Sequence, residues 1–249
     1  PTASQGRNKG WQAGFSPLVQ FLDSDTLLNP TWLNIAVPKL IESQANAVYG
    51  YIRERYPQKS VFHWIGDQEW NGLPGSVDAF GGNVLMTRET LRHFGGYNEQ
   101  LVVGEDPDLS FRIRKEGGKI VFIDAPMATH DLGSFSWKQY FKRAVRSGYA
   151  FAEIHDRHPD FWGKEMFRIW IRGGGFFLFA LLGLFLHKVF WIPALVLLLY
   201  PRLFKVKNLE EEKRLTEEKA KVYAWHASLV VIPQFFGALR YYLGFPLMN

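Results

Sequence analysis

One apolar stretch limits the folds open to this 249-residue chain more than any other feature. Residues 173–200 read GGGFFLFALLGLFLHKVFWIPALVLLLY, in which only His187 and Lys188 are strongly polar. A membrane-spanning helix needs about 20 consecutive apolar residues. His187 and Lys188 divide the stretch into runs of 14 and 12 residues, each too short to cross a bilayer comfortably. The pattern therefore favours a hairpin that enters a membrane and returns over a single crossing.

Basic residues flank this apolar stretch on both sides. Trp170 and Trp191 add aromatic side chains that suit a membrane interface. Because Lys and Arg next to membrane segments stay on the cytoplasmic side, both flanks are expected at the cytoplasmic face of a membrane. A buried hairpin in the core of a soluble protein is the alternative. The flanking basic residues are Arg168 and Arg172 before the stretch and Arg202, Lys205 and Lys207 after it.

The remaining C-terminal residues alternate between charged and apolar. Residues 208–221 carry Glu and Lys at helical spacing and indicate a linker helix. Residues 222–247 are apolar and aromatic again, but Pro233, Gly237 and Arg240 interrupt them. We therefore expect a helix that lies in the membrane interface there, and not a second crossing.

The net charge of +5 is unevenly distributed along the chain. Residues 1–131 carry 12 Lys or Arg against 15 Asp or Glu, whereas residues 132–249 carry 17 against 9. A basic region can bind nucleic acid or anionic lipid. No nucleic-acid-binding motif occurs, and the basic residues surround the apolar stretch, so membrane lipid is the expected partner and nucleic acid is not. The absence of cysteine excludes disulfides, thiolate metal sites and cysteine nucleophiles.

The first 131 residues alternate between strand and helix patterns. Asn29-Pro30 indicates one helix start, and Asp106-Pro107 indicates another helix that Gly117-Gly118 ends. This alternation predicts an α/β sheet that binds ligands at the carboxyl ends of its strands. The expected strands are Leu18–Asp23, Ala47–Ile52, Val84–Thr87 and Lys119–Asp124.

Two acidic pairs follow apolar segments. Asp23 and Asp25 lie at the end of the first expected strand, where two carboxylates on a turn can converge on one hard cation such as Mg²⁺. Two solvated acids that cap the next helix are the alternative. Glu105 and Asp106 precede Pro107, where an Asp is a good N-cap. A carboxylate held there can also take a proton from an acceptor hydroxyl.

Four further groups of residues have both a functional and a structural interpretation. His130 follows a strand and is either a third metal ligand or an exposed loop residue. Gly81 and Gly82 either let the backbone approach a ligand or form a plain turn. Trp64 and Trp70 either stack on a sugar or pack in the core. One basic helix face, exposed to water or in contact with an anionic lipid or diphosphate, carries Lys138, Lys142, Arg143 and Arg146.

Taken in order, these motifs resemble those of family 2 glycosyltransferases over residues 3–150. The resemblance begins with Arg7-Asn8-Lys9-Gly10, Ala13-Gly14 and Phe21-Leu22-Asp23-Ser24-Asp25. It continues with Gly81-Gly82-Asn83, with Gly95-Gly96-Tyr97, with Gly104-Glu105-Asp106-Pro107-Asp108-Leu109 followed by Arg112 and Gly117, and with His130.

The resemblance implies an α/β architecture with a GT-A (Rossmann-like) catalytic domain over residues 1–160. A membrane-associated helical region over 161–249 would follow, with the apolar hairpin 173–200 and the interfacial helix 222–247. The implied reaction moves a sugar, with inversion, from a nucleotide-diphosphate-sugar donor to a hydroxyl of a lipid or saccharide acceptor. The implied location is the cytoplasmic face of a bacterial inner membrane.

The resemblance also implies roles for single residues. Asp106 would be the catalytic base. Asp23 and Asp25 would bind a divalent metal ion, Mg²⁺ or Mn²⁺, on the donor diphosphate, and His130 would assist them. The residues expected to bind the donor are Arg7, Asn8, Gly10, Asp23, Ser24, Gly82 and Asn83. The residues expected near the acceptor or diphosphate are Glu105, Trp64, Trp70, Arg143 and Arg146.

Two departures from the family pattern have consequences. The family's first β-α-β unit, which grips much of the nucleotide base, has no counterpart before Pro1, so we expect an N-terminally truncated chain that binds donor poorly. Residues Gln139–Arg143 match the Gln-x-x-Arg-Trp motif of processive synthases poorly, so we expect transfer of single sugars. The alternative function is a catalytically inactive membrane-bound scaffold of the same fold.

Overall fold

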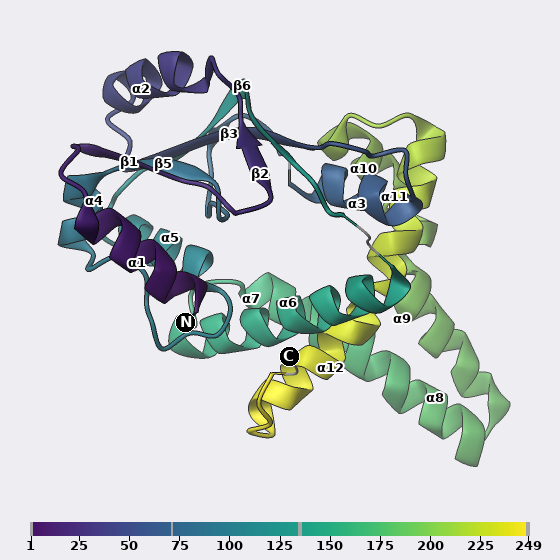
Figure 1. The fold of residues 1–249 in the computed structure, drawn as a ribbon. Helices are drawn as coiled ribbons and strands as arrows, with labels where there is room; N and C mark the ends of the chain where they lie inside the picture. Colours follow the sequence, from purple (N-terminus) through teal and green to yellow (C-terminus); the bar gives the residue numbers. More distant parts are fainter. Residues whose placement is uncertain (1, 71, 134–135, 248–249) are drawn as a thin grey trace. The chain divides into compact units, whose positions relative to one another are not determined.

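A computed structural model describes residues 2–70, 72–133 and 136–247 (Figure 1). The chain divides into two units, Pro1–Phe135 and Ser136–Asn249. This division lies earlier than the boundary after residue 160 that the sequence indicated. The reason is helix α6 (Trp137–Arg157), which packs along α12 (Val231–Tyr242) of the second unit.

The first unit contains a six-stranded mixed sheet with the strand order β1-β5-β3-β6-β2. Among the described strands, β3 and β6 alone pair in parallel. The pairs β1–β5, β3–β5 and β2–β6 are antiparallel, and β4 adds to β6 in the same sense. The strands are β1 (Leu18–Phe21), β2 (Thr26–Leu28), β3 (Ala47–Glu54), β4 (Gly75–Ser76), β5 (Val84–Thr87) and β6 (Ile120–His130).

Helices cover both faces of this sheet, as Figure 1 shows. One apolar core includes Ala47 of β3 and side chains of α1, α4 and α5, whereas the other includes Val48 and side chains of α2. Ala47 and Val48 point to opposite faces because successive side chains alternate across a strand. The helices are α1 (Ala3–Ala13), α2 (Trp32–Glu42), α3 (Val61–Glu69), α4 (Arg88–His93) and α5 (Glu105–Lys115). The predicted α/β class is therefore confirmed.

Strand β6 is longer than the sequence indicated. The prediction ended it at Asp124, but it continues to His130. Pro126 lies at an irregularity of the β3–β6 register, opposite Tyr51. A proline is tolerated in a strand at such a point, so the strand passes through it. The extension matters because it carries His130 to the carboxyl end of the sheet.

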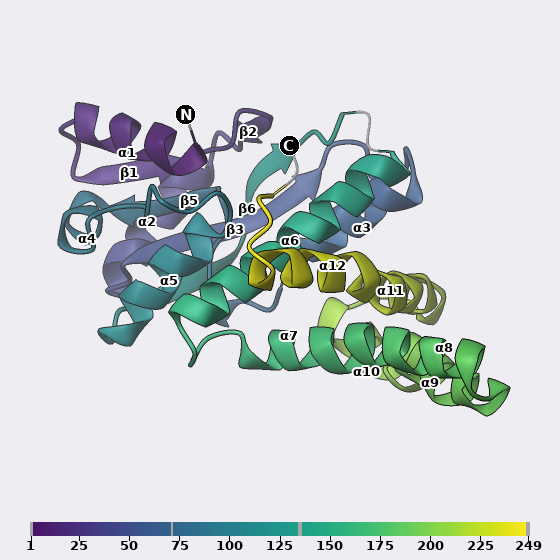
Figure 2. The same cartoon turned by 90° about the horizontal axis from the view of Figure 1, so that it is seen from below.

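The second unit is helical. Helix α7 (Gly163–Arg168), a π-helical turn (Ile169–Gly174) and α8 (Gly175–Phe185) follow one another without a break, and Figure 2 shows α7 and α8 in line. A turn at His187 and a short 3₁₀ helix (Lys188–Phe190) lead into the returning helix α9. Helices α8 and α9 therefore pack against each other, and the membrane placement of the expected hairpin 173–200 stays a prediction. The later helices are α9 (Trp191–Phe204), α10 (Val206–Lys213), α11 (Glu217–Leu229) and α12.

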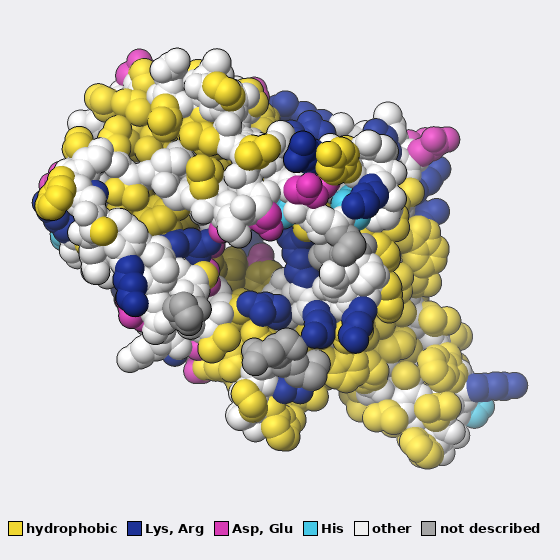
Figure 3. Space-filling view, in the orientation of Figure 1, with side chains coloured by type: hydrophobic (Ala, Val, Ile, Leu, Met, Phe, Trp, Pro, Cys, Tyr) yellow, Lys and Arg dark blue, Asp and Glu magenta, His cyan; other side chains and the backbone are white. Residues whose placement is uncertain are grey.

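Two helices of the described chain are long and apolar enough to cross a membrane, namely Gly163–Phe185 and Glu217–Tyr242. A bent pair, Lys188–Phe204 with Val206–Lys213, would make a third. Large apolar side chains are exposed along α8 and α9, and Figure 3 shows them gathered over these helices. The apolar composition and exposure agree with membrane association. Most of residues 222–247 belongs to the second of these helices, which is long enough to cross a membrane. The interfacial placement of this segment therefore stays a prediction.

Candidate active site

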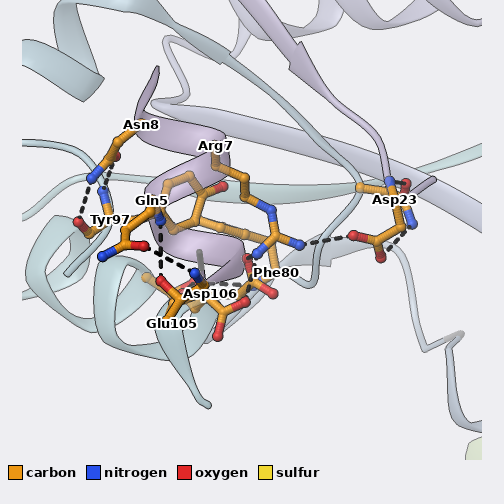
Figure 4. Close-up of polar contacts among 11 residues, drawn as sticks. Gln5, Arg7, Asn8, Asp23, Phe80, Tyr97, Glu105 and Asp106 are labelled. Carbon is orange, nitrogen blue, oxygen red and sulfur yellow. Dashed lines mark hydrogen bonds and ion pairs between the residues drawn. The ribbon is translucent and has the colours of Figure 1, made fainter. Parts of the chain in front are cut away.

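Arg7 lies at the centre of an acidic cluster in the first unit (Figure 4). A capping box between Thr2 and Gln5 starts α1 and places Arg7 in its second turn. The Arg7 guanidinium lies 2.8 Å from Asp23 Oδ1, 2.5 Å from Glu105 Oε1 and 3.6 Å from Asp106 Oδ1. Two predicted regions, the strand end at Asp23 and the helix start at Glu105–Asp106, therefore meet at one guanidinium.

Asp106 does not cap its helix. The N-cap of α5 is Gly104, with φ +83°, and the helix begins at Glu105. Glycine adopts this left-handed conformation without strain. Asp106 therefore lies inside the first turn, where the helix dipole favours a negative charge. Its Oδ1 atom is buried and has no hydrogen-bond partner.

Burial and the neighbouring charges bring the pKa of Asp106 close to neutral pH. Burial raises its pKa from the usual 3.8 to about 7, and the nearby carboxylates Glu105 and Asp23 act in the same direction. The positive charge of Arg7 opposes them. Burial works to lower the pKa of Arg7, but the surrounding acids raise it overall, so Arg7 stays charged. A base whose pKa lies near the working pH is suited to general-base catalysis.

Gly82 and Asn83 support Asp23. Asn83 is buried, and its Oδ1 accepts a 2.9 Å hydrogen bond from the Asp23 backbone N–H. A Cβ on Gly82 would lie 2.5 Å from Asp23 Oδ1 and 2.6 Å from the Arg7 guanidinium. The lack of a side chain at Gly82 therefore leaves space for the Arg7–Asp23 ion pair. This role is more specific than that of a glycine in a plain turn.

The buried side chain of Asn8 makes hydrogen bonds within the first unit. Its Nδ2 donates to Tyr97 O, and its Oδ1 accepts from the Tyr97 backbone N–H and from Trp11 Nε1. Asn8 thus holds the loop at Gly95–Tyr97 against α1. Ser24 and Gly10 are exposed. Donor binding by these three residues stays a prediction.

His130 and Asp25 form a second polar group at the carboxyl end of β6. The antiparallel pairing of β2 with β6 sets Thr26 opposite His130 and so brings the preceding Asp25 close. His130 Nε2 lies 3.2 Å from Asp25 Oδ2. The ring of Trp70 packs on His130 with 4.5 Å between ring centroids. Glu54, which belongs to none of the sequence motifs, lies 3.9 Å from Nδ1 of the imidazole.

The three predicted metal ligands do not converge on one point. In the part of the chain that the structure describes, no group of three or more His, Asp or Glu side chains is placed to bind one metal ion. Asp23 is paired with Arg7, whereas Asp25 is paired with His130. Asp25 and His130 alone nevertheless fit a divalent ion, because Mg²⁺ commonly takes one or two protein ligands and completes its shell with water and substrate phosphates.

The remaining predicted site residues lie on helices α3 and α6. Trp64 is half-buried on α3 of the first unit. Arg143 and Arg146 belong to α6 of the second unit, and Arg146 is exposed there. Their contact with an acceptor or diphosphate stays a prediction.

Comparisons with known proteins agree with this fold. A model of the glycosyltransferase-like family 2 matches residues 2–150. Pre-mycofactocin glycosyltransferases of two Mycobacterium tuberculosis strains are 25% identical over 165 residues, which cover 62% of this chain and 35% of theirs. The chain thus spans about a third of the length of these relatives.

A solved structure shares the fold. A mannosyltransferase from Pyrobaculum calidifontis, in complex with GDP-Man and Mn²⁺, superposes with a TM-score of 0.55 at 15% identity. The match covers 98% of this chain and 67% of the mannosyltransferase chain. Because the family model covers more than half of the chain and the fold agrees, the chain belongs to the glycosyltransferase-like family 2 and has the GT-A fold.

Proposed function

We propose that this chain carries the catalytic site of a glycosyltransferase that moves a sugar from a nucleotide-diphosphate-sugar donor to a hydroxyl acceptor with inversion. The observation that carries the proposal is the Asp106 carboxylate. It is only 15% exposed, has an oxygen without a hydrogen-bond partner, and has a pKa raised to about 7. Such a group can accept a proton at neutral pH from a substrate hydroxyl.

The reaction would be a single displacement. The acceptor oxygen attacks the anomeric carbon of the donor sugar as its proton passes to Asp106. The bond between the anomeric carbon and the diphosphate oxygen breaks, and the nucleoside diphosphate leaves with the bonding electrons. Attack from the side opposite the leaving group inverts the anomeric centre. Arg7, held by Asp23 and Glu105, supplies fixed positive charge beside the base.

A divalent ion, Mg²⁺ or Mn²⁺, would be held by Asp25 and His130, with Asp23 two residues earlier in the chain. When bound, the ion would neutralise the charge that develops on the diphosphate leaving group. The chemistry of the two donors supports this placement, since a carboxylate oxygen and an imidazole nitrogen face each other across 3.2 Å. The Mn²⁺ and GDP-Man in the archaeal mannosyltransferase structure support the same choice of cofactor and donor class.

The second unit would keep the enzyme on a membrane. Its exposed apolar helices support this placement, and the basic residues that flank them favour the cytoplasmic face. A membrane-bound transferase has access to a lipid-linked acceptor, although a saccharide acceptor fits the same chemistry. Transfer would be non-processive, as the departure from the Gln-x-x-Arg-Trp motif indicates.

The decisive experiment compares Asp106→Asn with wild type in the full protein. Asn has nearly the same shape but cannot accept a proton at neutral pH, so transfer should fall about 10²–10⁴-fold. Asp78→Asn is the matched control, because Asp78 is exposed and pairs with Arg114 on the surface of the unit. A screen of UDP- and GDP-sugars supplies the donor. If Asp106→Asn transfers sugar as fast as Asp78→Asn, the proposed base is wrong.

A further inference from the structure

The buried carboxylate of Glu54 lies directly behind His130. Glu54 is the last residue of β3, and the parallel pairing of β3 with β6 places it in register with His130. Its side chain is 0% exposed, and Oε2 lies 3.9 Å from His130 Nδ1. The Arg55 backbone N–H donates to the His130 carbonyl, which fixes the two strand ends relative to each other.

Backbone hydrogen bonds hold the Glu54 carboxylate in place. Oε1 accepts from the Tyr56 backbone N–H, and Oε2 accepts from the Leu132 backbone N–H. The Glu54 backbone N–H in turn donates to the buried carboxylate of Asp67. Within the described residues, the ion pairing of Glu54 is confined to His130. A buried carboxylate without another cationic partner favours an N–H group pointing toward it.

His130 provides the complementary group. Its Nδ1 atom is buried and has no partner within hydrogen-bond distance. The ring of Trp70 packs on the imidazole and restricts its orientation. If Nδ1 carries the proton, it points at Glu54, and Nε2 then has a lone pair that faces Asp25 Oδ2 at 3.2 Å. Two electron-pair donors at this distance repel each other unless a cation lies between them.

We propose that Glu54 is a positioning residue that holds His130 in its Nδ1–H tautomer, so that Nε2 and Asp25 together present a lone pair and a carboxylate to a divalent cation. The inference rests on the proposed function, because that function supplies the need for a cation here. Glu54 Oε2 lies 3.9 Å from Nδ1, beyond hydrogen-bond distance, so the buried carboxylate acts on the Nδ1–H group through its charge. A carboxylate on this side of a metal-binding histidine raises the basicity of the ligand and fixes its orientation. Removal of such a partner typically weakens metal binding about 10–100-fold.

The first test measures the tautomer of His130 in the wild-type protein and needs no metal or substrate. Long-range ¹H–¹⁵N spectra of the full protein labelled at histidine report which ring nitrogen carries the proton, and His130→Asn assigns the signal. The proposal expects a protonated Nδ1 and an unprotonated Nε2. A His130 that is protonated at Nε2, or at both nitrogens between Asp25 and Glu54, overturns it.

The second test measures Mn²⁺ affinity by electron paramagnetic resonance in the absence of donor. Glu54→Gln should bind Mn²⁺ about 10–100-fold more weakly than wild type. The matched control is Glu116→Gln, which alters another Glu–His pair, 2.6 Å from His93 on an exposed surface. Its Mn²⁺ affinity should equal that of wild type.

Equal Mn²⁺ affinity of Glu54→Gln and wild type, or no Mn²⁺ binding by wild type, overturns the proposal. Thermal unfolding shows whether Glu54→Gln is folded, and the tautomer of the wild type decides the question if it is not. Neither readout depends on glycosyl transfer. An absence of sugar transfer would therefore count against the proposed function alone and would leave this inference standing.

Discussion

Replacement of Arg7 by Gln is expected to move the acid limb of the pH–rate profile to higher pH. Asp106 acts as a base only when it is deprotonated, so the rate falls as the pH drops below its pKa, which lies at about 7. Arg7 lowers that pKa, whereas Glu105 and Asp23 raise it. Without the guanidinium, the proton would be held more tightly, and the base would become active only at higher pH.

The size of the change follows from the geometry. The Arg7 guanidinium lies 3.6 Å from Asp106 Oδ1. At an effective dielectric constant of 20, two unit charges at this distance interact by roughly 5 kcal/mol. This corresponds to about three pH units, since one unit is equivalent to about 1.4 kcal/mol. Water that enters the space left by Arg7 will reduce the effect. The apparent pKa of the acid limb should therefore rise by about one to three.

The assay is the dependence of kcat/KM on pH across the neutral range, at saturating Mg²⁺ or Mn²⁺. The position of the limb is independent of the absolute rate, so weaker donor binding by Arg7→Gln does not obscure it. Arg7→Lys keeps a positive charge and should return the limb toward wild type. Arg114→Gln, which removes a surface arginine paired with Asp78, is the matched control. An unchanged limb in Arg7→Gln would refute the assignment of Asp106.

Three further predictions concern the metal, the glycine beside Asp23 and the membrane. EDTA should abolish transfer and Mg²⁺ or Mn²⁺ should restore it, and full activity in EDTA would contradict a metal-assisted reaction. Gly82→Ala displaces Asp23 and should lower the transfer rate by up to about 10²-fold with little change in unfolding temperature, while Gly81→Ala, which meets open space, should be neutral. The chain lacks cysteine, so single thiols at Lys164→Cys and Lys188→Cys can be labelled from each side of the membrane. They should react from opposite faces, because the 23-residue helix Gly163–Phe185 that joins them is about 34 Å long, whereas labelling from one face would indicate a hairpin that does not cross.

Local sequence signals predicted the parts of the first unit that depend on local structure. Strands β1, β3 and β5 lie where apolar runs indicated them, and α5 begins within a residue of its Asp-Pro signal. Strand β6 differs, because the prediction ended it at Asp124 and it continues to His130. Its parallel partner β3 accommodates Pro126 at a register shift, so the strand passes through the proline.

The arrangement of the site depends on contacts that local signals do not contain. Arg7 is 98 residues from Glu105 and 16 from Asp23 in the chain, yet it joins both. The family motif selected all three residues without indicating that Asp23 pairs with Arg7, whereas Asp25 pairs with His130. Glu54 was overlooked because the predicted strand ended at Ile52. If the predicted strand had been two residues longer, the Glu54 carboxylate would have lain at the carboxyl end of a central strand. Ligands of α/β sheets bind at these strand ends.

In the second unit, the structure changes which basic residues can set the membrane orientation. Arg168 and Arg172 were expected to flank the apolar stretch, but the helix runs past both. The guanidinium of Arg172 donates to backbone carbonyls of α9 and α11, and Arg168 donates to Gln234. Cations engaged inside a helical unit satisfy its own backbone and are not available to lipid headgroups. A cytoplasmic orientation must therefore rest mainly on the exposed Lys205 and Lys207 that follow the hairpin.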